Sequence, residues 1–398
     1  MRKFCLSIFS VLLFLAAACE REPAPTPGPQ PAPFTPLDST HLIFFYTCGH
    51  NNGLSTNIEN NFNEILKGTY IPYLADTSRI VLFHSHSNDK APLLRRIGRD
   101  DSGNVTTVDL HWEEFDNWDD STFCISSDTL SKMLTAANAR FHAKRNYLVF
   151  SSHASGWTPA GAFLSDKYIP VASSIGQDLG KDGVHVYEME LPRFADKLPF
   201  RLNGIIFDAC LMACVETAWE LRGKCDIVGF SPTEIMAHGM YYETMLDNLF
   251  KDDVVQVAKD YMSFYRNRGS NPYGCYTVVD CRKMDALAEA CKQIFNAHRS
   301  RIDGVNPDDV QHYFRDNHTW FYDLRDLTRA LGSDPGELAL MDAALAYCVL
   351  FADHTDYFLT LKIERSCGLS TYLPRTGSTD LSAYYKLLKW NEATEYVR

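Results

Sequence analysis

The chain has 398 residues, of which 45% are hydrophobic, and its formal net charge is −12. This length and apolar content allow a large buried core, built as one big domain or two ordinary ones. The acidity argues against a nucleic-acid-binding protein, because a phosphate backbone repels negative charge, and it favours cationic partners.

The N-terminus has the pattern of an export signal. Arg2 and Lys3 precede the apolar run Leu6–Ala18, and small residues then lead directly to Cys19. A basic start, a short apolar core and small residues are typical of a cleaved signal rather than of a spanning helix. Residues 1–18 are therefore predicted to be a lipoprotein signal peptide, with Cys19 as the lipidated first mature residue. The alternative is an ordinary signal peptide, since Leu15 stands one place further upstream of the Cys than in the usual lipoprotein box.

Residues 19–40 are rich in proline and are predicted to be an extended tether. The tether would hold a folded body, residues 41–398, away from a membrane. The expected location is the envelope of a bacterium, lipid-anchored, and either periplasmic or exposed at the surface.

The first half of the body alternates strands and helices. Apolar, β-branched runs predict strands over His41–Tyr46, Arg79–Phe83, Tyr147–Phe150, Gly204–Phe207 and Asp226–Phe230. Helical periodicity is found over Asn57–Leu66, Thr129–His142 with Asp128 as N-cap, Glu188–Lys197 and Leu211–Leu221. Residues 87–120 read as a hairpin or surface excursion. This alternation predicts an α/β fold with a mostly parallel sheet flanked by helices.

The second half is predicted to be rich in helices. The helical runs are Val254–Arg266, Lys283–Arg301, Glu337–Phe351 and Leu381–Tyr396. Tyr276–Val279 and Leu369–Tyr372 resemble strands, and the second of these is expected to join this half to the main sheet.

Two strands are each followed at once by a chemically reactive side chain. Cys210 comes after the strand Gly204–Phe207, where the helix Leu211–Leu221 is expected to begin, and His153 follows the strand Tyr147–Phe150. A helix N-terminus favours a thiolate, and strand ends in an open parallel sheet share one edge. The pattern indicates a nucleophile and its proton acceptor.

The strings Asp208-Ala209-Cys210-Leu211-Met212 and His153-Ala154-Ser155-Gly156-Trp157, with the late strand Cys367–Pro374, resemble the clostripain-like cysteine peptidases. The resemblance covers roughly residues 41–375 and implies a caspase-like fold. One position departs from the family pattern, because Ala154 stands where the family usually has Gly after its catalytic His.

The resemblance implies an endopeptidase that cleaves proteins or peptides after Arg or Lys through a Cys-His dyad. Cys210 would attack the scissile carbonyl to form a thioester, and His153 would activate it and protonate the leaving amine. The backbone N–H groups of Cys210 and Ala154 would stabilise the oxyanion. If the turn after His153 needs a positive φ, Ala154 costs about 1 kcal/mol of strain; otherwise nothing is lost.

Three further residues are expected at the substrate pocket. Asp208 precedes Cys210 by two, so its carboxylate faces the same side of the strand, and in the family the matching Asp helps bind a basic side chain. Glu234 is a candidate for a second acid, and Ser231 for part of a pocket wall. Asp208 could instead hold loop N–H groups.

A metal site is weakly indicated. His84 and His86 alternate on a strand and could chelate a metal, but two ligands are too few. No Cys-x-x-Cys occurs. Calcium, which clostripain-like enzymes use in some cases, stays an unplaced cofactor, because no Asp/Asn cluster has loop-ligand spacing.

Two questions stay open at this point. A catalytically silent lipoprotein that binds peptides in the same cleft is the alternative to an enzyme, and Ala154 is the feature that favours it. The segment between His153 and Cys210 contains Lys181 and Lys167, candidate self-cleavage sites for a basic-site peptidase; the competing hypothesis is an enzyme that works as one unbroken chain.

Overall fold

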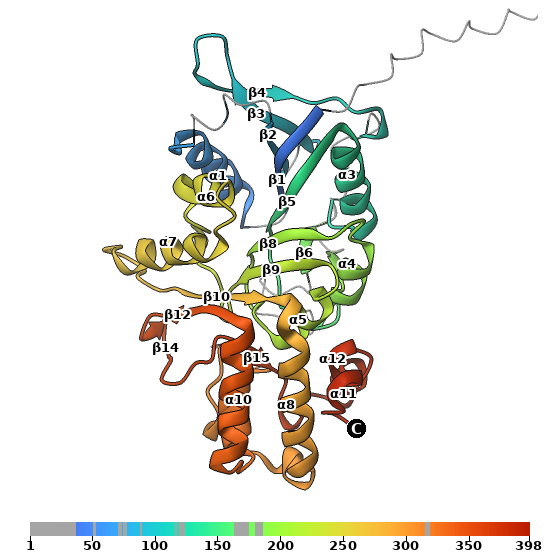
Figure 1. Cartoon of the computed structure of the whole chain (residues 1–398), viewed down its shortest axis with the longest axis vertical. Coiled ribbons are helices and arrows are strands. Elements are labelled where there is room, and N and C mark those ends of the chain that lie inside the picture. Colours follow the sequence, from blue (N-terminus) through green and yellow to red (C-terminus); the bar gives the residue numbers. More distant parts are fainter. Residues whose placement is uncertain are drawn as a thin grey trace, which may run out of the picture. The chain divides into compact units, whose positions relative to one another are not determined.

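A nine-stranded sheet with the order β12-β10-β9-β8-β5-β1-β2-β3-β4 organises the body of the protein in a computed structural model (Figure 1). The structure describes residues 37–50, 53–70, 74, 78–87, 90–115, 118, 124–162, 175–179, 186–314 and 319–398. The strands of the main sheet, in chain order, are β1 (Leu37–Gly49), β2 (Arg79–Ser87), β3 (Leu93–Arg99), β4 (Val105–Asp109), β5 (Phe141–Ser151), β8 (Leu202–Asp208), β9 (Cys225–Phe230), β10 (Cys275–Asp280) and β12 (Val349–His354).

The centre of the sheet is parallel and its edges are antiparallel. Strands β9, β8, β5, β1 and β2 run in the same direction. On one side β10 and β12 pair antiparallel, and on the other side the hairpin β3–β4 does so. This architecture confirms the predicted α/β fold with a mostly parallel, caspase-like sheet, and β3–β4 accounts for the predicted excursion after residue 87.

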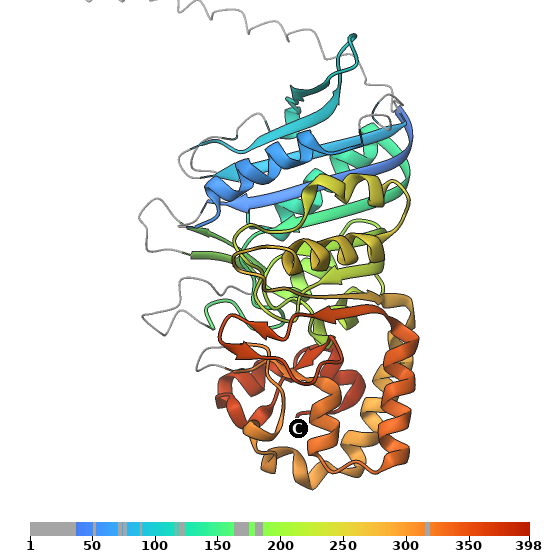
Figure 2. The same ribbon diagram turned by 90° about the vertical axis from the view of Figure 1, so that its left-hand side faces the viewer.

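Both faces of the sheet are covered by helices, as the alternating side chains of β1 require. Ile43 and Phe45 belong to one buried core with α1, α6 and α7, whereas Leu42 and Phe44 belong to the other with α3, α4 and α5. Figures 1 and 2 show these two helical layers on either side of the sheet. The helices are α1 (Ser55–Lys67), α3 (Ser127–Arg140), α4 (Leu191–Lys197), α5 (Val215–Leu221), α6 (Tyr242–Leu249), α7 (Val254–Arg266), α8 (Met284–Ala297), α9 (Leu324–Ala330), α10 (Pro335–Cys348), α11 (Thr379–Tyr385) and α12 (Lys389–Thr394).

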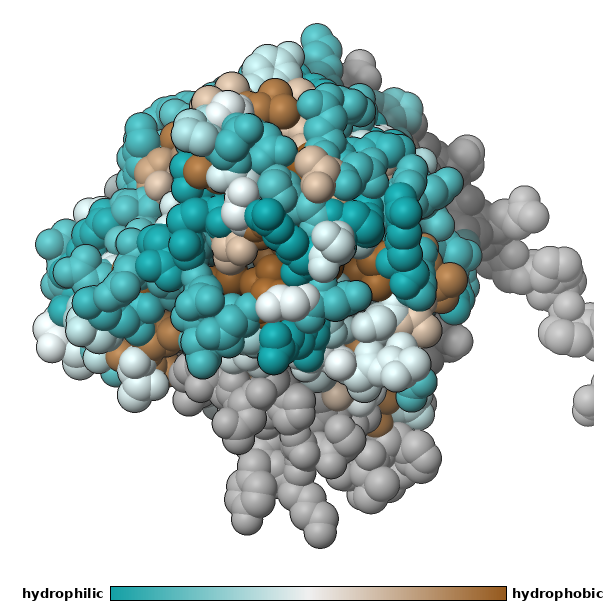
Figure 3. All heavy atoms as spheres, turned by 90° about the horizontal axis from the view of Figure 1, so that it is seen from below, coloured by the Kyte–Doolittle hydropathy of each residue, from teal (hydrophilic) through white to brown (hydrophobic). Residues whose placement is uncertain are grey.

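The helix-rich second half is joined to the sheet through β10 and β12, not through the late strand expected near Thr371. That late strand is β15 (Ser370–Thr371), which pairs with β11 (Tyr322–Asp323) in a separate small sheet. Two other small sheets are β6 (Ile175–Leu179) with β7 (Val186–Met189), and β13 (Tyr357–Phe358) with β14 (Leu361–Lys362). Seen from the end where α8 and α10 lie, the surface is largely hydrophilic, with small, separate apolar areas (Figure 3).

Several predicted helix boundaries were wrong. The N-cap of α3 is Ser126, whose side chain accepts from the Thr129 N–H, while Asp128 forms ion pairs with Arg193 and Lys197. The helix expected directly after Cys210 begins four residues later than predicted, at Val215. The long C-terminal run is two short helices, α11 and α12. Within the described part of the chain, no helix has the length and apolarity needed to span a membrane.

Candidate active site

The register of two central strands brings Cys210 and His153 to the same edge of the sheet. Strands β5 and β8 pair in parallel, with Ser151 opposite Asp208. His153 and Cys210 each follow the paired residue of their own strand by two positions, so both lie just beyond the carboxyl ends of these strands. Both side chains line one cavity of about 230 Å³.

Cys210 lies in a tight turn rather than at a helix N-terminus. Leu211 has a φ of 59°, a left-handed conformation that costs a non-glycine residue about 1–2 kcal/mol. The turn is held to the loop after β9, because the Leu211 N–H donates to the Thr233 carbonyl (2.9 Å) and the Ala213 N–H to that of Ser231 (2.8 Å). From the same loop the Ile235 N–H donates to Cys210 Sγ (3.3 Å), a contact that favours negative charge on the sulfur.

The loop that carries His153 packs directly on the turn after Cys210. Gly156 has a φ of 61°, and a Cβ built on it would lie 2.6 Å from the Leu211 carbonyl oxygen. Only glycine allows this close approach of the two backbones. Trp157 is fully buried and packs on the rings of Tyr372 and Tyr385, so the C-terminal half fixes the loop from behind.

The His153 imidazole is largely enclosed, and burial lowers its pKa to about 4. The ring is therefore neutral at pH 7, the state in which an imidazole accepts a proton. Within the described part of the chain, its ring nitrogens form no hydrogen bond with another side chain. Ala154 does not have a positive φ, so an alanine in place of the family's glycine costs no backbone strain.

The N–H of Ala154 takes no part in the backbone pairing of its own loop. Ala154 and Ile175 form an antiparallel bridge that uses the flanking peptide groups, with the Gly176 N–H donating to the His153 carbonyl (2.7 Å). In such a pair the residues directly opposite each other do not exchange hydrogen bonds. β6 thereby holds the loop, and Ala154 presents its donor away from β6.

Asp208 also lines the cavity, as the sequence suggested. Its Oδ2 accepts from Tyr242 Oη (2.6 Å) and from Ser151 Oγ (3.1 Å). Burial raises the pKa of the carboxyl, although the hydrogen bonds from Tyr242, Ser151 and the Met240 backbone oppose the shift. A cation entering the cavity would therefore stabilise the ionised form of a carboxylate that is otherwise poorly solvated.

Of the other two residues expected at the pocket, one lines the cavity and one does not. Glu234 lines the cavity. Ser231 is fully buried and is not among the residues that line it; its Oγ accepts from the Thr233 N–H (3.2 Å) and stabilises the loop after β9.

Other candidate positions give no metal centre. His84 and His86 are both fully buried, with His84 stacked on Tyr46 and His86 Nδ1 lying 3.3 Å from Asp178. Among the residues that the structure describes, no group of three or more His, Cys, Asp or Glu could hold a metal ion. Cys19, Lys167 and Lys181 lie outside the described residues.

The cavity contains residues that sequence reasoning did not find. Gly239 has a φ of 77°, and a Cβ built on it would lie 2.6 Å from Asp208 Oδ2. Phe358, the last residue of β13, and Leu359, in the turn before β14, line the cavity from a distant part of the sequence. Gly239 could have been noticed as an isolated glycine in the loop after β9. The two-residue strands of the hairpin leave no periodic signal.

Comparison with known proteins agrees with this arrangement. The model of the clostripain family matches residues 45–333. A structure of an inactive zymogen C11 protease from Parabacteroides distasonis is 24% identical, covers 91% of this chain and 99% of its own, and superposes with a TM-score of 0.74. A secreted C11 cysteine protease from Bacteroides thetaiotaomicron, in complex with an irreversible peptide inhibitor, is 22% identical over 90% of this chain and 99% of its own, with a TM-score of 0.74.

No match is found among curated proteins. The two similar structures show the fold, since their identities are low. The family model spans well over half of the chain and includes both strand ends that meet at the cavity. The chain therefore belongs to the clostripain family and is a cysteine endopeptidase.

Proposed function

We propose that this peptidase cleaves after Arg or Lys, with Cys210 as nucleophile and His153 as its only catalytic partner. The observation that carries the proposal is that Asp208, a buried carboxylate, lines the same cavity as these two residues. A substrate guanidinium or ammonium that pairs with Asp208 would leave its scissile carbonyl beside the sulfur. Glu234 adds a second acid to the cavity.

The reaction follows from these positions. Neutral His153 removes the Cys210 proton, Sγ bonds to the scissile carbon, and the electron pair of the carbonyl moves to its oxygen. We assign the stabilisation of that oxyanion to the backbone N–H groups of Cys210 and Ala154. Collapse of the tetrahedral species breaks the C–N bond as His153 returns its proton to the leaving amine. Water, activated by the same ring, then hydrolyses the thioester.

The alternative of a silent peptide binder rests on Ala154, and two observations weigh against it. Ala154 has no positive φ, and its N–H lies outside the pairing with Ile175. The donor that an oxyanion needs is a backbone group, which alanine supplies as well as glycine does.

We also propose that the protein is exported and anchored by a lipid on Cys19. The sequence pattern before Cys19 supports this, and one similar structure is of a protease described as secreted. Metabolic labelling with a radioactive fatty acid should mark the wild type and not Cys19→Ala. Equal labelling of both would contradict the anchor.

The specificity test uses a peptide set that differs only in the residue before the scissile bond: Arg, Lys, Gln or Leu. Cys210→Ala and His153→Ala should each lower kcat/KM at least about 10³-fold on every cleaved peptide. Asp208→Asn should lower it about 10²–10³-fold for Arg and Lys only, because an unpaired charge would be left buried. An equal loss on basic and neutral peptides would reduce Asp208 to a structural role.

A glycine pair sharpens this test. Gly239→Ala would place a methyl group against the Asp208 carboxylate and should also lose basic peptides selectively. Gly269→Ala is the matched control, because nothing lies within 4 Å of a Cβ built there, and it should leave kcat/KM unchanged. Unimpaired cleavage after Arg by Gly239→Ala would mean that the basic side chain does not reach Asp208.

A further inference from the structure

The hairpin β13–β14 brings a distant segment to the cavity. It follows β12 in the chain, lies close to that strand, and places Phe358 and Leu359 among the lining residues together with Cys210 and His153 (Figure 1). Phe358 is almost fully buried and packs near the ring of Tyr273, whereas Leu359 is partly exposed. The hairpin therefore adds an apolar surface to a cavity that is also lined by the acidic residues Asp208 and Glu234.

Leu359 occupies a backbone conformation that a leucine adopts rarely. Its φ is 53°, in the left-handed region where glycine or asparagine would be relaxed. Strained residues of this kind persist only where the surrounding structure holds them, and they gather at ligand-binding sites. Glycine would form this turn without strain, so the presence of leucine indicates that its side chain has a function.

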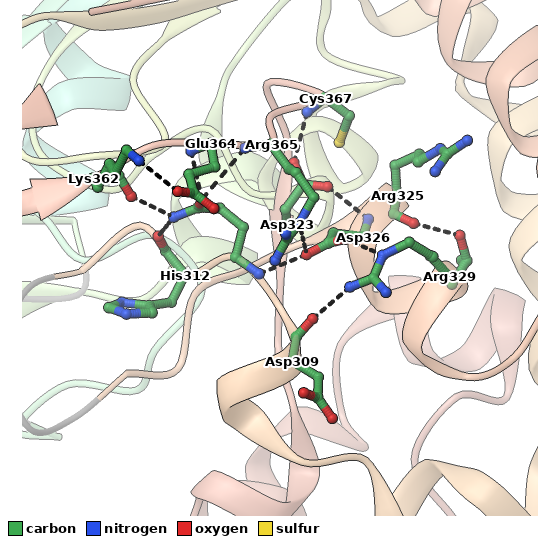
Figure 4. Close-up of polar contacts among 12 residues, drawn as sticks. Asp309, His312, Asp323, Arg325, Asp326, Arg329, Lys362, Glu364, Arg365 and Cys367 are labelled. Atoms are coloured by element: carbon green, nitrogen blue, oxygen red, sulfur yellow. Dashed lines mark hydrogen bonds and ion pairs between the residues drawn. The ribbon is translucent and has the colours of Figure 1, made fainter. Parts of the chain in front are cut away.

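The segment after β14 is fixed by buried polar contacts. Asp326 Oδ2 accepts from Arg365 Nε (2.8 Å) and from the Gln311 N–H (2.7 Å), and Asp326 Oδ1 accepts from Arg329 (2.6 Å). Gln311 also donates to the Lys362 carbonyl in β14 (3.1 Å). Figure 4 shows the side chains of Asp326 and Arg329, from α9, converging with that of Arg365, from the segment between β14 and β15. These contacts hold β14 and the residues after it in place, and thereby fix the base of the hairpin that carries Leu359.

The order of the sheet indicates which side of the scissile bond the hairpin faces. Along the sheet, β5 carries His153, β8 carries Cys210, and β9, β10 and β12 follow on the far side of Cys210. The amine that His153 protonates departs toward β5. The acyl part of the substrate, on the N-terminal side of the bond, therefore extends toward β9–β12, where the hairpin begins.

We propose that the hairpin forms an apolar subsite in which Leu359, backed by Phe358, contacts the substrate residue immediately N-terminal to the basic residue. Met236, from the loop after β9, also lines the cavity and would complete an apolar surround. The preferred substrate is then a peptide with a large aliphatic residue directly before Arg or Lys. This inference rests on the proposed function, since it assumes that the basic side chain points to Asp208.

The test compares two fluorogenic peptides that are identical except for Leu or Ser before Arg. Wild type should favour the Leu peptide about tenfold in kcat/KM. Leu359→Asn and Leu359→Gly both accept a positive φ, so the turn survives, and both should bring the ratio close to one while changing the Ser peptide less than about threefold. The control is Leu387→Asn, which removes a 78% exposed leucine remote in sequence from the cavity residues and should keep the wild-type ratio.

A ratio that stays near tenfold in both Leu359 variants, or a wild type that shows no preference, would overturn the subsite. Loss of activity on both peptides in equal measure would overturn it as well. The same two peptides are titrated into Cys210→Ala by fluorescence anisotropy, so that the preference is read as affinity without turnover. Replacing Arg by Gln in both peptides separates the two ideas: a retained Leu preference with no Arg preference would defeat the basic pocket and leave the hairpin subsite standing.

Discussion

At the scale of single residues, the site depends on a few backbone conformations that fix where reactive atoms lie. Leu211 turns the chain immediately after Cys210, and Gly156 lets the His153 loop touch that turn. The sequence predicted Cys210, His153, Asp208 and Glu234 at one edge, because each follows a recognisable strand. It did not predict the turn at Leu211, because a leucine carries no signal for a left-handed conformation.

The low pKa of His153 has a measurable consequence. Burial lowers the pKa to about 4, so the ring stays neutral above that value and becomes charged only as the pH falls through it. A charged ring cannot accept the thiol proton. We therefore expect kcat/KM of Asp208→Asn on a neutral peptide to hold down to about pH 5 and to fall through about pH 4, instead of near the ordinary value of about 6.5.

Asp208 should add a second acid limb in the wild type. Its pKa is raised by burial, so its negative charge is lost at a higher pH than for an exposed aspartate, and the cleavage of basic peptides should fall with it. The pH profile of the wild type on a basic peptide and that of Asp208→Asn on a neutral peptide should differ only in this second acid limb. An acid limb close to pH 6.5 in the Asp208→Asn variant would show that burial does not lower the pKa of His153 in the working enzyme.

At the scale of elements, prediction succeeded where periodicity is long and failed where tertiary contacts decide. Helix α7 was predicted with both of its ends, and the central strands were located, because apolar spacing alone defines them. Helix α5 starts late because Leu211 and Ala213 are held by backbone hydrogen bonds to the loop after β9. The hairpin β13–β14 has strands of two residues, which no window of sequence can detect.

The base of this hairpin gives a prediction about stability and binding. Asp326 is 2% exposed and accepts from two arginines and one backbone N–H, which hold its pKa below the ordinary value although burial opposes the shift. Asp326→Asn should lower the free energy of unfolding by about 1–3 kcal/mol and raise KM, since buried donors lose a charged partner. Urea denaturation and steady-state kinetics measure the two effects.

A nearby carboxylate serves as the control. Asp342 pairs with Arg325, but its side chain is 53% exposed, so Asp342→Asn should cost less than about 1 kcal/mol and leave KM unchanged. If both variants lose the same stability, the buried network is no more important than a surface ion pair.

At the scale of the whole molecule, one sheet joins both halves of the chain. The segment between His153 and Cys210 connects β5 to β8, two strands that pair in the middle of the sheet, and it contains the pair β6–β7. The helix-rich half adds β10 and β12 to the same sheet. A break in the chain between β6 and β7 would therefore leave the paired strands of the main sheet in place.

Lys181 stands in the connection between β6 and β7, so self-cleavage after it is expected to leave one assembled particle. If the wild type cuts itself there, incubated residues 40–398 should show two fragments by denaturing intact-mass analysis and a single species of unchanged size by native chromatography. Cys210→Ala should stay unbroken, which excludes a contaminating protease. An unbroken wild type that is fully active would establish the single-chain enzyme instead, and a break after Lys167 would move the site within the segment.

The residues that line the cavity are spread through the sequence from Leu54 to Leu359. The order in which the chain is synthesised therefore determines when the site can form. A copy that is still leaving the ribosome already contains Cys210 and His153 long before Phe358 and Leu359, the last residues that line its cavity, have emerged. The complete substrate site exists only when the chain through Leu359 is available to fold. The fold thereby delays the finished protease until that residue has been made, and a copy terminated before it never completes the site.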